Sequence, residues 1–504
     1  MTIQSSVWLG TASLPRYQAL DADQETDVVV VGGGLIGLTT ALHLQQEGVG
    51  VVLLEGGRIA TRTSGNTTGK VTSQHGAVYA GLLDRHGRDK AQQYAAANQE
   101  AVDEVDAIAR RLGIDCELSR GPSYVYSTGD LRDEAEAARE LGLPAQLADP
   151  LEMGLPLSAA SAVRFDNQLL LHPARYLAGL ASAFTGAGGR IFERTRVTEL
   201  NAEGDGVEAR TESGRRVVAR HAVAATLLPF GTLGGYFART RPNQSHGIAV
   251  KLPVQAPTAM TISAEAPTRS TRPWPGGGPN GLIVVGADHE TGGQEDTNAS
   301  YQSLVDWVDQ LWGTKVQPEY RWSAEDYSTA DQLPYVGKAP GSPVLVATGM
   351  HKWGLSNGTV AAGILRDLVL GRSNRWSDVF DAGRIGDARS VAKLVQDNLK
   401  VGKEFAAGHL RRLLGPGLDH VEVGEGGLFD LDGTTVGAYR DQGGTLHTVV
   451  PVCTHLGCPL RWNQGDSTWD CNCHGSRFAP DGAVLDGPAT SPLEKPDQRN
   501  GKRG

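Results

Sequence analysis

The sequence predicts an α/β protein with α+β insertions, in which a Rossmann-like dinucleotide-binding domain precedes a small all-β domain. Two observations carry this prediction. The stretch from Asp27 to Glu55 has the pattern of a strand, a glycine-rich turn, a helix and a second strand. From about residue 413 the chain changes to short strands and turns, and this part holds four of the five cysteines.

Length and charge narrow the possible functions. At 504 residues the chain is long enough for two or three domains. The net charge is −10 at pH 7 and no basic cluster is present, which argues against a nucleic-acid partner. No run of about 18 apolar residues occurs, so no transmembrane segment is expected. Residues 1–10 carry no positive charge and no long apolar core, so the expected compartment is the cytoplasm.

The first motif is typical of dinucleotide binding. The all-apolar run 28–31 predicts a strand buried on both faces. Gly32 permits the tight turn, Gly34 lets the backbone approach a pyrophosphate, and Gly37 lets helix and strand pack closely. Glu55 ends the second strand, where a carboxylate can accept hydrogen bonds from a ribose.

A second GxGxxG pattern is formed by Gly276, Gly278 and Gly281. No strand is predicted before it and no helix after it, so we interpret this match as a loop. The sequence therefore predicts a single dinucleotide-binding unit.

The remaining elements follow in chain order. Residues 1–25 are expected to form an irregular N-terminal arm. The polar stretch 58–76 can run beside a cofactor, and His75 within it is interpreted as a polar loop residue. Hydrophobic periodicity predicts the other elements. The expected helices span 89–112, 130–141, part of 169–188, 359–370 and 391–410, and the expected strands span 121–127, 191–200 and parts of 207–225.

The sharpest signal lies in the C-terminal part. Cys453 and His455 are one residue apart, and Cys471 and His474 form a CxxH pair. Two cysteines and two histidines suit either a zinc site or a Rieske [2Fe–2S] cluster. Zinc fingers favour CxxC and HxxxH pairs, whereas here each loop offers one thiolate and one imidazole. This mixed arrangement resembles Rieske proteins, in which two cysteines bind one iron and two histidines bind the other.

The resemblance to Rieske proteins extends beyond these four residues. Cys458, Cys473 and the pair Gly475-Ser476 match the Rieske subunits of cytochrome bc complexes. In those subunits the two additional cysteines form a disulfide between the cluster loops. The resemblance therefore implies a disulfide between Cys458 and Cys473.

Residues 1–370 resemble the flavin oxidoreductases related to D-amino-acid oxidase, glycine oxidase and sarcosine oxidase. The resemblance rests on 27–55, on 172–197, and on 329–337 together with 346–354. It implies FAD rather than NAD as the cofactor. It also implies that the adenosine half lies at the first glycine motif and the flavin ring at the last segment. The FAD-binding residues that it implies are Gly32, Gly34, Gly37, Glu55, Ser64, Val197, Gly349 and Gly354.

The resemblances divide the chain into four parts. After the arm, 26–371 form an FAD-dependent oxidoreductase domain. Its dinucleotide-binding parts lie at about 26–110, 165–230 and 325–371, with an inserted substrate domain between them. Residues 372–412 are expected to form a helical linker, and 413–497 a Rieske domain.

The whole chain resembles bacterial flavin oxidoreductases fused to a C-terminal Rieske domain. It is expected to oxidise a C–N bond of a small amine or amino acid and to pass electrons from FAD to the cluster, then to an external acceptor. An NAD(P)H-dependent flavin reductase feeding a Rieske carrier is the alternative, and it needs a second nucleotide unit. A Rieske oxygenase needs a mononuclear iron, but the thirteen histidines form no HxxxH or HxxxxH pair. A non-enzymatic redox sensor stays open.

The substrate site has no clear sequence signal. Arg269 and Arg272 suit a carboxylate substrate. They fall in the Pro-rich stretch 267–279, which we interpret as a solvated surface loop. No catalytic residue is assigned.

Overall fold

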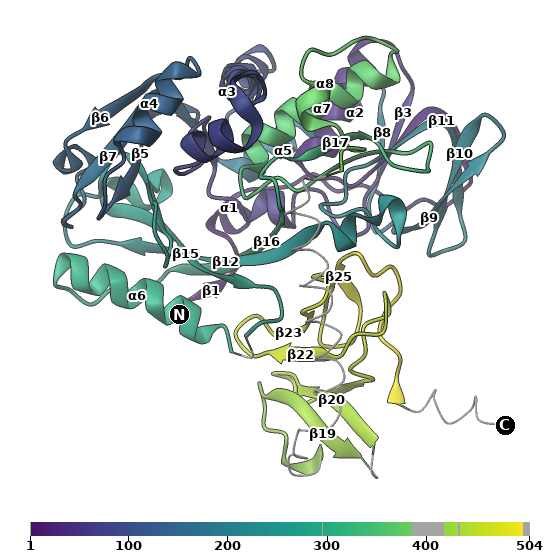
Figure 1. Cartoon of the computed structure of the whole chain (residues 1–504). Helices are drawn as coiled ribbons and strands as arrows, with labels where there is room; N and C mark the ends of the chain where they lie inside the picture. The colour runs from purple at the N-terminus through teal and green to yellow at the C-terminus, as the bar shows by residue number, and fades with distance from the viewer. Residues whose placement is uncertain (1, 295, 386–417, 432–433, 497–504) are drawn as a thin grey trace.

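The computed structural model describes residues 2–294, 296–385, 418–431 and 434–496. This part of the chain forms two large sheets and two small ones (Figure 1). The expected helix 391–410 and most of the expected linker lie outside the described residues. Among the helices described, none combines the length and the apolar character that a membrane span requires.

The first large sheet is the dinucleotide-binding sheet. Its core is the parallel set β8-β3-β2-β11-β18, and β17 adds an antiparallel edge. Strands β9 and β10 extend it beside β11. The bounds are β2 Gln24–Val31, β3 Val51–Leu54, β8 Arg190–Phe192, β9 Val197–Glu203, β10 Gly206–Thr211, β11 Arg216–Ala224, β17 Tyr335–Lys338 and β18 Leu345–Thr348.

Strand β2 shows why this sheet is central to the fold. Val28 and Val30 pack into a core shared with helices α2, α3, α5 and α7. Val29 and Val31 pack into a second core on the opposite face. The prediction of a strand buried on both faces is confirmed. The helix bounds are α2 Leu35–Gln46, α3 Tyr79–Arg111, α5 Pro173–Gly186 and α7 Gly354–Val369.

The second large sheet has the order β1-β16-β12-β15-β14-β13-β5-β7-β4, with β6 paired to β7. Helix α6 packs on β12 and β15 through an apolar core that includes Ile248, Val284 and Leu304. Helix α4 lies beside α3 and β6. The bounds are β1 Ile3–Gln4, β4 Lys70–Val71, β5 Ser119–Ser127, α4 Arg132–Glu140, β6 Ala145–Ala148, β7 Ser161–Leu170, β12 Thr240–Lys251, β13 Met260–Ser263, β14 Arg269–Pro273, β15 Gly281–Glu290, α6 Asn298–Trp312 and β16 Tyr320–Thr329.

Several local predictions differ from the structure. The N-terminal arm is not wholly irregular, because it holds β1 and α1 (Val7–Thr11), and the arm is anchored by Trp8, which is buried. The single strand expected over 191–200 is divided into β8 and β9. The second glycine pattern forms a short 3-10 turn, η4 (Pro275–Asn280), between β14 and β15, so a strand does precede it, although no helix follows.

The interpretation of 267–279 as a solvated loop was wrong for its first half. Arg269 and Arg272 lie in β14, and both side chains are buried. Arg272 donates to the carbonyl oxygens of Thr68, Gly69 and Leu171, and it packs over the ring of Trp8. Arg272 therefore joins three segments of the fold and is used structurally.

The C-terminal part is a small all-β unit, so the predicted fold class is confirmed. A three-stranded sheet (β19 Gly426–Leu431, β20 Thr434–Arg440, β21 Leu446–Val449) lies beside a four-stranded one (β22 Leu460–Asn463, β23 Thr468–Cys471, β24 Arg477–Phe478, β25 Val484–Asp486). Its core includes Trp462, Trp469 and Phe478. Figure 1 shows the yellow strands of this unit beneath β12 and β16.

One carboxylate anchors this unit to the rest of the molecule. Asp466, in the turn after β22, accepts hydrogen bonds from Gln244 (2.5 Å), Tyr301 (2.9 Å) and Ser323 (2.7 Å). It also pairs with Arg477 at 2.9 Å. Burial would raise the pKa of Asp466, but Arg477 and the surrounding donors outweigh it and lower the pKa. Asp466 is therefore a buried carboxylate that holds the two parts together.

Candidate cofactor sites

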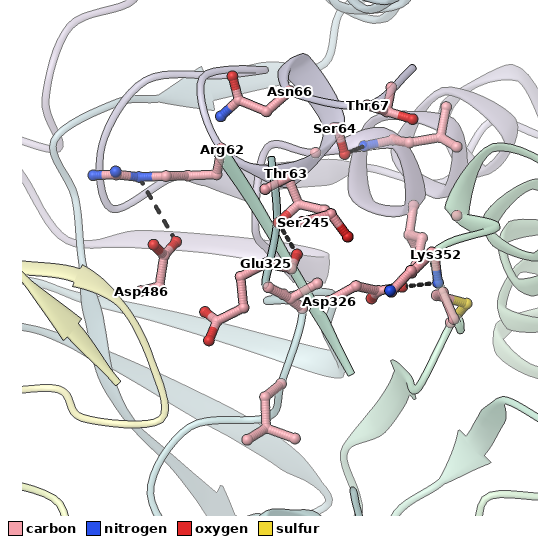
Figure 2. Close-up of a pocket in the computed structure, with 18 of the residues that line it drawn as sticks. Arg62, Thr63, Ser64, Asn66, Thr67, Ser245, Glu325, Asp326, Lys352 and Asp486 are labelled. Atoms are coloured by element: carbon pink, nitrogen blue, oxygen red, sulfur yellow. Dashed lines mark hydrogen bonds and ion pairs between the residues drawn. The ribbon is translucent and has the colours of Figure 1, made fainter. Parts of the chain in front are cut away.

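A cavity of about 510 Å³ lies between the two large sheets. It extends from the first glycine motif and Glu55, past Arg62, to Lys352 and the start of α7. Figure 2 shows Arg62 and Lys352 at opposite ends, with Thr63 and Glu325 between them. Among the eight residues that the family resemblance assigns to FAD, six line the cavity: Gly32, Gly34, Glu55, Ser64, Val197 and Gly354.

The glycine motif is shaped as a dinucleotide turn requires. Gly32 has φ of +111°, and a Cβ there would lie 2.4 Å from the Ala225 oxygen. Gly37 is behind the cavity, and its Cβ would lie 1.9 Å from the Gly32 oxygen. Gly34 is the N-cap of α2, so the first N–H groups of that helix, which have no partner within the helix itself, lie at the cavity. The turn therefore suits the pyrophosphate of FAD.

The acid that follows the motif is fixed by the backbone. The two carboxylate oxygens of Glu55 accept from the Gly33 and Gly57 N–H groups, each at 2.7 Å. Burial raises the pKa of Glu55. An ionised carboxylate has about four lone-pair sites, so acceptor capacity remains for ribose hydroxyls. Ser64 accepts from the Leu35 N–H at 3.1 Å, which places it at the α2 N-terminus.

The opposite end of the cavity carries unusual backbone geometry. His351 and Lys352 have φ of +54° and +69°, and Gly349 has φ of +76°. A non-glycine residue in this region costs about 1–3 kcal/mol, and such strain is concentrated at functional sites. Thr329 holds His351 through a hydrogen bond of 2.8 Å to Nε2. Gly349 lies behind the cavity, where a Cβ would be 2.5 Å from Thr329.

No local sequence pattern predicts the polar groups at this end of the cavity. The Lys70 ammonium donates to the Thr261 carbonyl (2.8 Å) and to Ser270 (2.5 Å), and burial lowers its pKa to about 7. Lys352 pairs with Asp288 at 3.0 Å. Lys70 is one lysine in a two-residue strand, and only the pairing of distant strands brings it to the cavity. No local pattern could have identified it.

His75 lies in a loop, as the sequence predicts, but its side chain is not at the surface. It is buried, lines the cavity, and stacks on Trp353 with ring centroids 4.9 Å apart. Its ring nitrogens contact the hydroxyls of Tyr94 (2.6 Å) and Ser356 (2.8 Å). Burial lowers the pKa of His75 to about 3, so the imidazole is neutral at pH 7.

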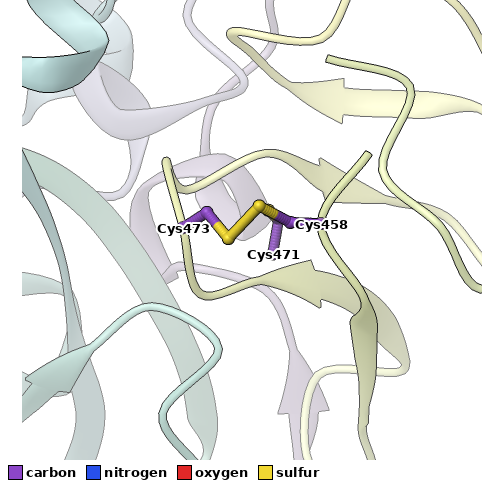
Figure 3. Close-up of side chains that lie close together, drawn as sticks. All are labelled: Cys458, Cys471 and Cys473. Carbon is purple, nitrogen blue, oxygen red and sulfur yellow. A yellow bond between two sulfur atoms is a disulfide. The ribbon is translucent and has the colours of Figure 1, made fainter. Parts of the chain in front are cut away.

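The C-terminal unit brings the two cysteine–histidine loops together. The Cys453 N–H donates to the Cys458 carbonyl at 2.8 Å, and the Cys471 N–H donates to the Ser476 carbonyl at 2.9 Å, so each loop is closed on itself. Cys458 and Cys473 form a disulfide between the loops (Figure 3). The disulfide implied by the resemblance is present.

The four residues expected to hold the cluster form two close pairs, one of cysteines and one of histidines. The thiols of Cys453 and Cys471 contact each other, and this contact lowers the pKa of Cys453. The rings of His455 and His474 have centroids 5.1 Å apart. Burial lowers the pKa of both histidines, to about 4 for His474, so both imidazoles are neutral at pH 7, the form that binds metal.

The two ring nitrogens of His455 show whether this residue suits a metal ligand. His455 Nε2 lies 3.0 Å from the Gly231 carbonyl oxygen. His455 Nδ1 is buried and has no hydrogen-bond partner among the described residues. A metal-binding imidazole typically donates through one nitrogen and coordinates through the other. The unpartnered Nδ1 therefore fits an iron ligand.

Both histidine rings face the flavin part of the chain. Phe237, in η3 (Leu233–Ala238), lies edge-on to His455 and His474 at 5.2 Å and 5.1 Å between ring centroids. The Tyr327 hydroxyl donates to the His474 carbonyl at 3.0 Å. The side of the C-terminal unit that carries the histidines is thus packed against the dinucleotide-binding part.

Comparison with known proteins agrees with both sites. The family model described as FAD dependent oxidoreductase matches residues 27–368, and the Rieske [2Fe-2S] domain model matches 419–497. The Rieske 2Fe-2S iron-sulfur protein YhfW of Bacillus subtilis is 34% identical over 500 residues, which cover 97% of each chain. The gamma-glutamylputrescine oxidoreductase of Escherichia coli is 24% identical over 397 residues, covering 73% of this chain and 90% of that one.

Among solved structures, glycine oxidase from Geobacillus kaustophilus aligns with a TM-score of 0.62 at 21% identity. The alignment covers 72% of this chain and 100% of that chain. The two matched models indicate FAD and a Rieske [2Fe–2S] cluster as the cofactors. The chain therefore belongs to the FAD-dependent oxidoreductase family and carries a Rieske [2Fe–2S] domain at its C-terminal end.

Proposed function

We propose that this enzyme oxidises a C–N bond of an amine or amino acid and passes the electrons through the Rieske cluster to an external acceptor. The observation that carries the proposal is the packing of His455 and His474 against Gly231 and Phe237 of the flavin part. Bound FAD supplies two-electron oxidation, and a [2Fe–2S] cluster supplies one-electron transfer at roughly −150 to +300 mV.

The residues of each site have proposed roles. Cys453, His455, Cys471 and His474 hold the cluster. The eight positions implied by the family resemblance hold FAD. Six of them line the cavity, and Gly37 and Gly349 lie behind it and allow the close approach of neighbouring segments. The boundaries at about 26, 371, 413 and 497 remain the proposed domain division, and the cytoplasm remains the predicted compartment.

The substrate class has two supports. The relatives named above are called a glycine oxidase and a gamma-glutamylputrescine oxidoreductase, so a C–N bond is the expected target. The far end of the cavity offers a buried cation, Lys70, and hydroxyls at Ser245 and Ser270. An ammonium and hydroxyls can bind and orient a carboxylate. No arginine lines this end among the described residues, so Lys70 is the proposed carboxylate anchor.

The other polar groups at this end have supporting tasks. Asp288 keeps Lys352 paired, and Ser245 donates to Asp288 at 2.6 Å, so this pair is held in one position. Neutral His75 packs on Trp353 beside the start of α7, which keeps that part of the cavity dry and rigid. These residues are proposed to bind and orient the substrate and to exclude water from the cavity. Proton abstraction is not assigned to any of them.

Anaerobic mixing tests the function directly. The holoenzyme is mixed with a panel of amines and amino acids, and flavin bleaching is followed together with the paramagnetic signal of the reduced cluster. Bleaching followed by the cluster signal is expected for at least one member. Bleaching by NADH or NADPH but by no amine would favour the reductase alternative. Bleaching without any cluster signal would contradict the route through the cluster.

A further inference from the structure

One segment of the C-terminal unit lies between the two cofactor sites. We call residues 484–490, which begin with β25, the partition segment. Although it belongs to the Rieske domain, five of its seven residues line the flavin cavity: Leu485, Asp486, Gly487, Ala489 and Thr490. The cavity is therefore not formed by the flavin part alone.

The flavin part holds the backbone of the partition segment by three hydrogen bonds. Arg196 donates to the Val484 carbonyl at 2.8 Å. The Gly231 N–H donates to the Pro488 carbonyl at 3.0 Å, and the Tyr327 hydroxyl lies 3.3 Å from the Gly487 oxygen. Each bond satisfies a backbone acceptor, so the segment has a defined position at the edge of the cavity.

An ion pair joins the same segment to the loop that follows the first glycine motif. Arg62 Nε lies 3.9 Å from Asp486 Oδ1, and Figure 2 shows the pair at one end of the cavity. Asp486 is mostly buried, with a side-chain exposure of 13%. Arg196 and Val197 line the cavity at this end, and Val197 is one of the FAD-binding residues that the family resemblance implies. The partition segment therefore covers the end expected to hold the adenosine half.

The other side of the segment contacts the cluster loop. The Ala489 N–H donates to Ser476 Oγ at 3.0 Å, and the Ser476 carbonyl accepts from the Cys471 N–H. The Tyr327 hydroxyl bridges the segment and the loop, since it contacts the oxygens of both Gly487 and His474. One short stretch of chain thus separates the flavin cavity from the cluster loop.

We propose that the partition segment is part of the FAD-binding site, so that FAD binding and docking of the Rieske domain stabilise each other. Leu485 is only half-buried although it faces the cavity, and FAD in the cavity would cover it. Burying that apolar surface favours binding. Because linkage is reciprocal, FAD strengthens docking by the same factor by which docking strengthens FAD binding. The proposal rests on FAD as the cofactor and not on the identity of the substrate.

The first experiment measures FAD affinity in the full chain. Deflavinated Leu485→Ala protein is titrated with FAD, and quenching of flavin fluorescence gives the dissociation constant. The constant should rise about tenfold, because part of the apolar contact is lost. Leu446→Ala is the matched control, since Leu446 is a half-buried leucine of the same domain that does not line the cavity. Its dissociation constant should equal that of the unmodified protein.

The second experiment needs no variant. Hydrogen exchange of the unmodified protein is compared with and without FAD. Exchange in 484–490 should slow when FAD binds, while β20 and β21, on the far side of the domain, should not change. Equal exchange in 484–490 with and without FAD would overturn the proposal, as would unchanged FAD affinity in Leu485→Ala. If Leu485→Ala loses its cluster or does not fold, the exchange experiment decides. Neither measurement uses an amine, so a failed substrate panel leaves both results valid.

Discussion

The cluster loops and the flavin cavity are built in opposite ways. The four expected cluster ligands lie in two loops between residues 453 and 474, and each loop is closed by its own backbone hydrogen bonds. The flavin cavity is lined by segments from residue 31 to residue 490, including part of the Rieske domain. We therefore expect the loss of any one of the four ligands to abolish the cluster. Most single substitutions in the cavity should weaken FAD binding only in part. The exception is a glycine where two backbone segments are so close that a side chain cannot fit between them.

The two sites also differ in charge. The histidines of the cluster loops are neutral because burial lowers their pKa. The cavity instead retains buried ionisable groups, among them Lys70 and Asp326. Burial lowers the pKa of Lys70 to about 7 and raises the pKa of Asp326 to about 6. Charged groups are costly to bury, so their presence indicates a polar ligand at this end.

The largest effect is expected at the local site. Cys453→Ser removes one of two thiolates, and the paramagnetic and visible signals of the cluster should disappear completely. FAD should remain bound at saturating concentration, because most of the cavity is formed by other segments. Cys116→Ser is the matched control, since Cys116 is a buried thiol that burial keeps protonated, with a pKa raised to about 11. A cluster retained in Cys453→Ser would contradict the ligand assignment.

A large effect is also expected at Gly37, where the helix and the glycine turn behind the cavity approach each other closely. In Gly37→Ala, the new Cβ would lie 1.9 Å from the Gly32 oxygen, which must move the turn. Overpacking of this kind costs about 3 kcal/mol, so FAD affinity should fall about 100-fold. Gly363→Ala in α7 is the control, because its Cβ would meet nothing within 4 Å. Equal FAD titrations for the two variants would show that the close approach is unimportant.

The same contrast explains what the sequence could predict. The cluster residues and the first glycine motif are local patterns, so Cys453 to His474 and Gly32 to Glu55 were accessible from spacing alone. Lys70 reaches the cavity because β4 pairs with β7 and because its ammonium donates to Thr261 of β13 and Ser270 of β14, a long-range arrangement that no local pattern encodes. The partition segment was also missed, because the contact between two domains has no periodicity of its own.

A smaller effect is expected for Lys70. Burial lowers the pKa of its ammonium to about 7, so Lys70 is a cation below pH 7 and a neutral amine above it. If it anchors a carboxylate, kcat/KM for amino acids should be constant below about pH 7 and fall about tenfold per pH unit above it. Lys70→Met should raise KM about 10- to 100-fold at pH 6.5, estimated from one charge-assisted hydrogen bond, and remove that pH dependence.

The control for Lys70 is an exposed lysine elsewhere. Lys338→Met changes the same charge at the end of β17, outside the cavity, and should leave the pH profile intact. Amines without a carboxylate should respond little to Lys70→Met. An equal loss for amines and amino acids would show that Lys70 supports the fold rather than the substrate carboxylate.

The smallest effect concerns the disulfide between Cys458 and Cys473. The bond closes a loop of about 15 residues, which in a chain-entropy model stabilises a fold by about 3 kcal/mol. With the cluster bound, both loops are already joined through iron, so much of this constraint is redundant. Cys458→Ser should therefore retain its cluster at room temperature and lose it about five- to tenfold faster on mild heating, an effect of about 1–1.4 kcal/mol.

Two comparisons make this last prediction specific. Because the bond is a single interaction, Cys473→Ser and the double variant should each lose the cluster at the same rate as Cys458→Ser. FAD content should stay unchanged during the heating, since the anchoring carboxylate Asp466 lies outside the cluster loops. Disulfides are rare in a reducing cytosol, the compartment predicted from the sequence, so a bond that persists there needs protection by burial; Cys458 is buried and Cys473 is partly buried. Alkylation of the denatured, unreduced protein at Cys458 and Cys473, detected by mass, would show free thiols and exclude the bond.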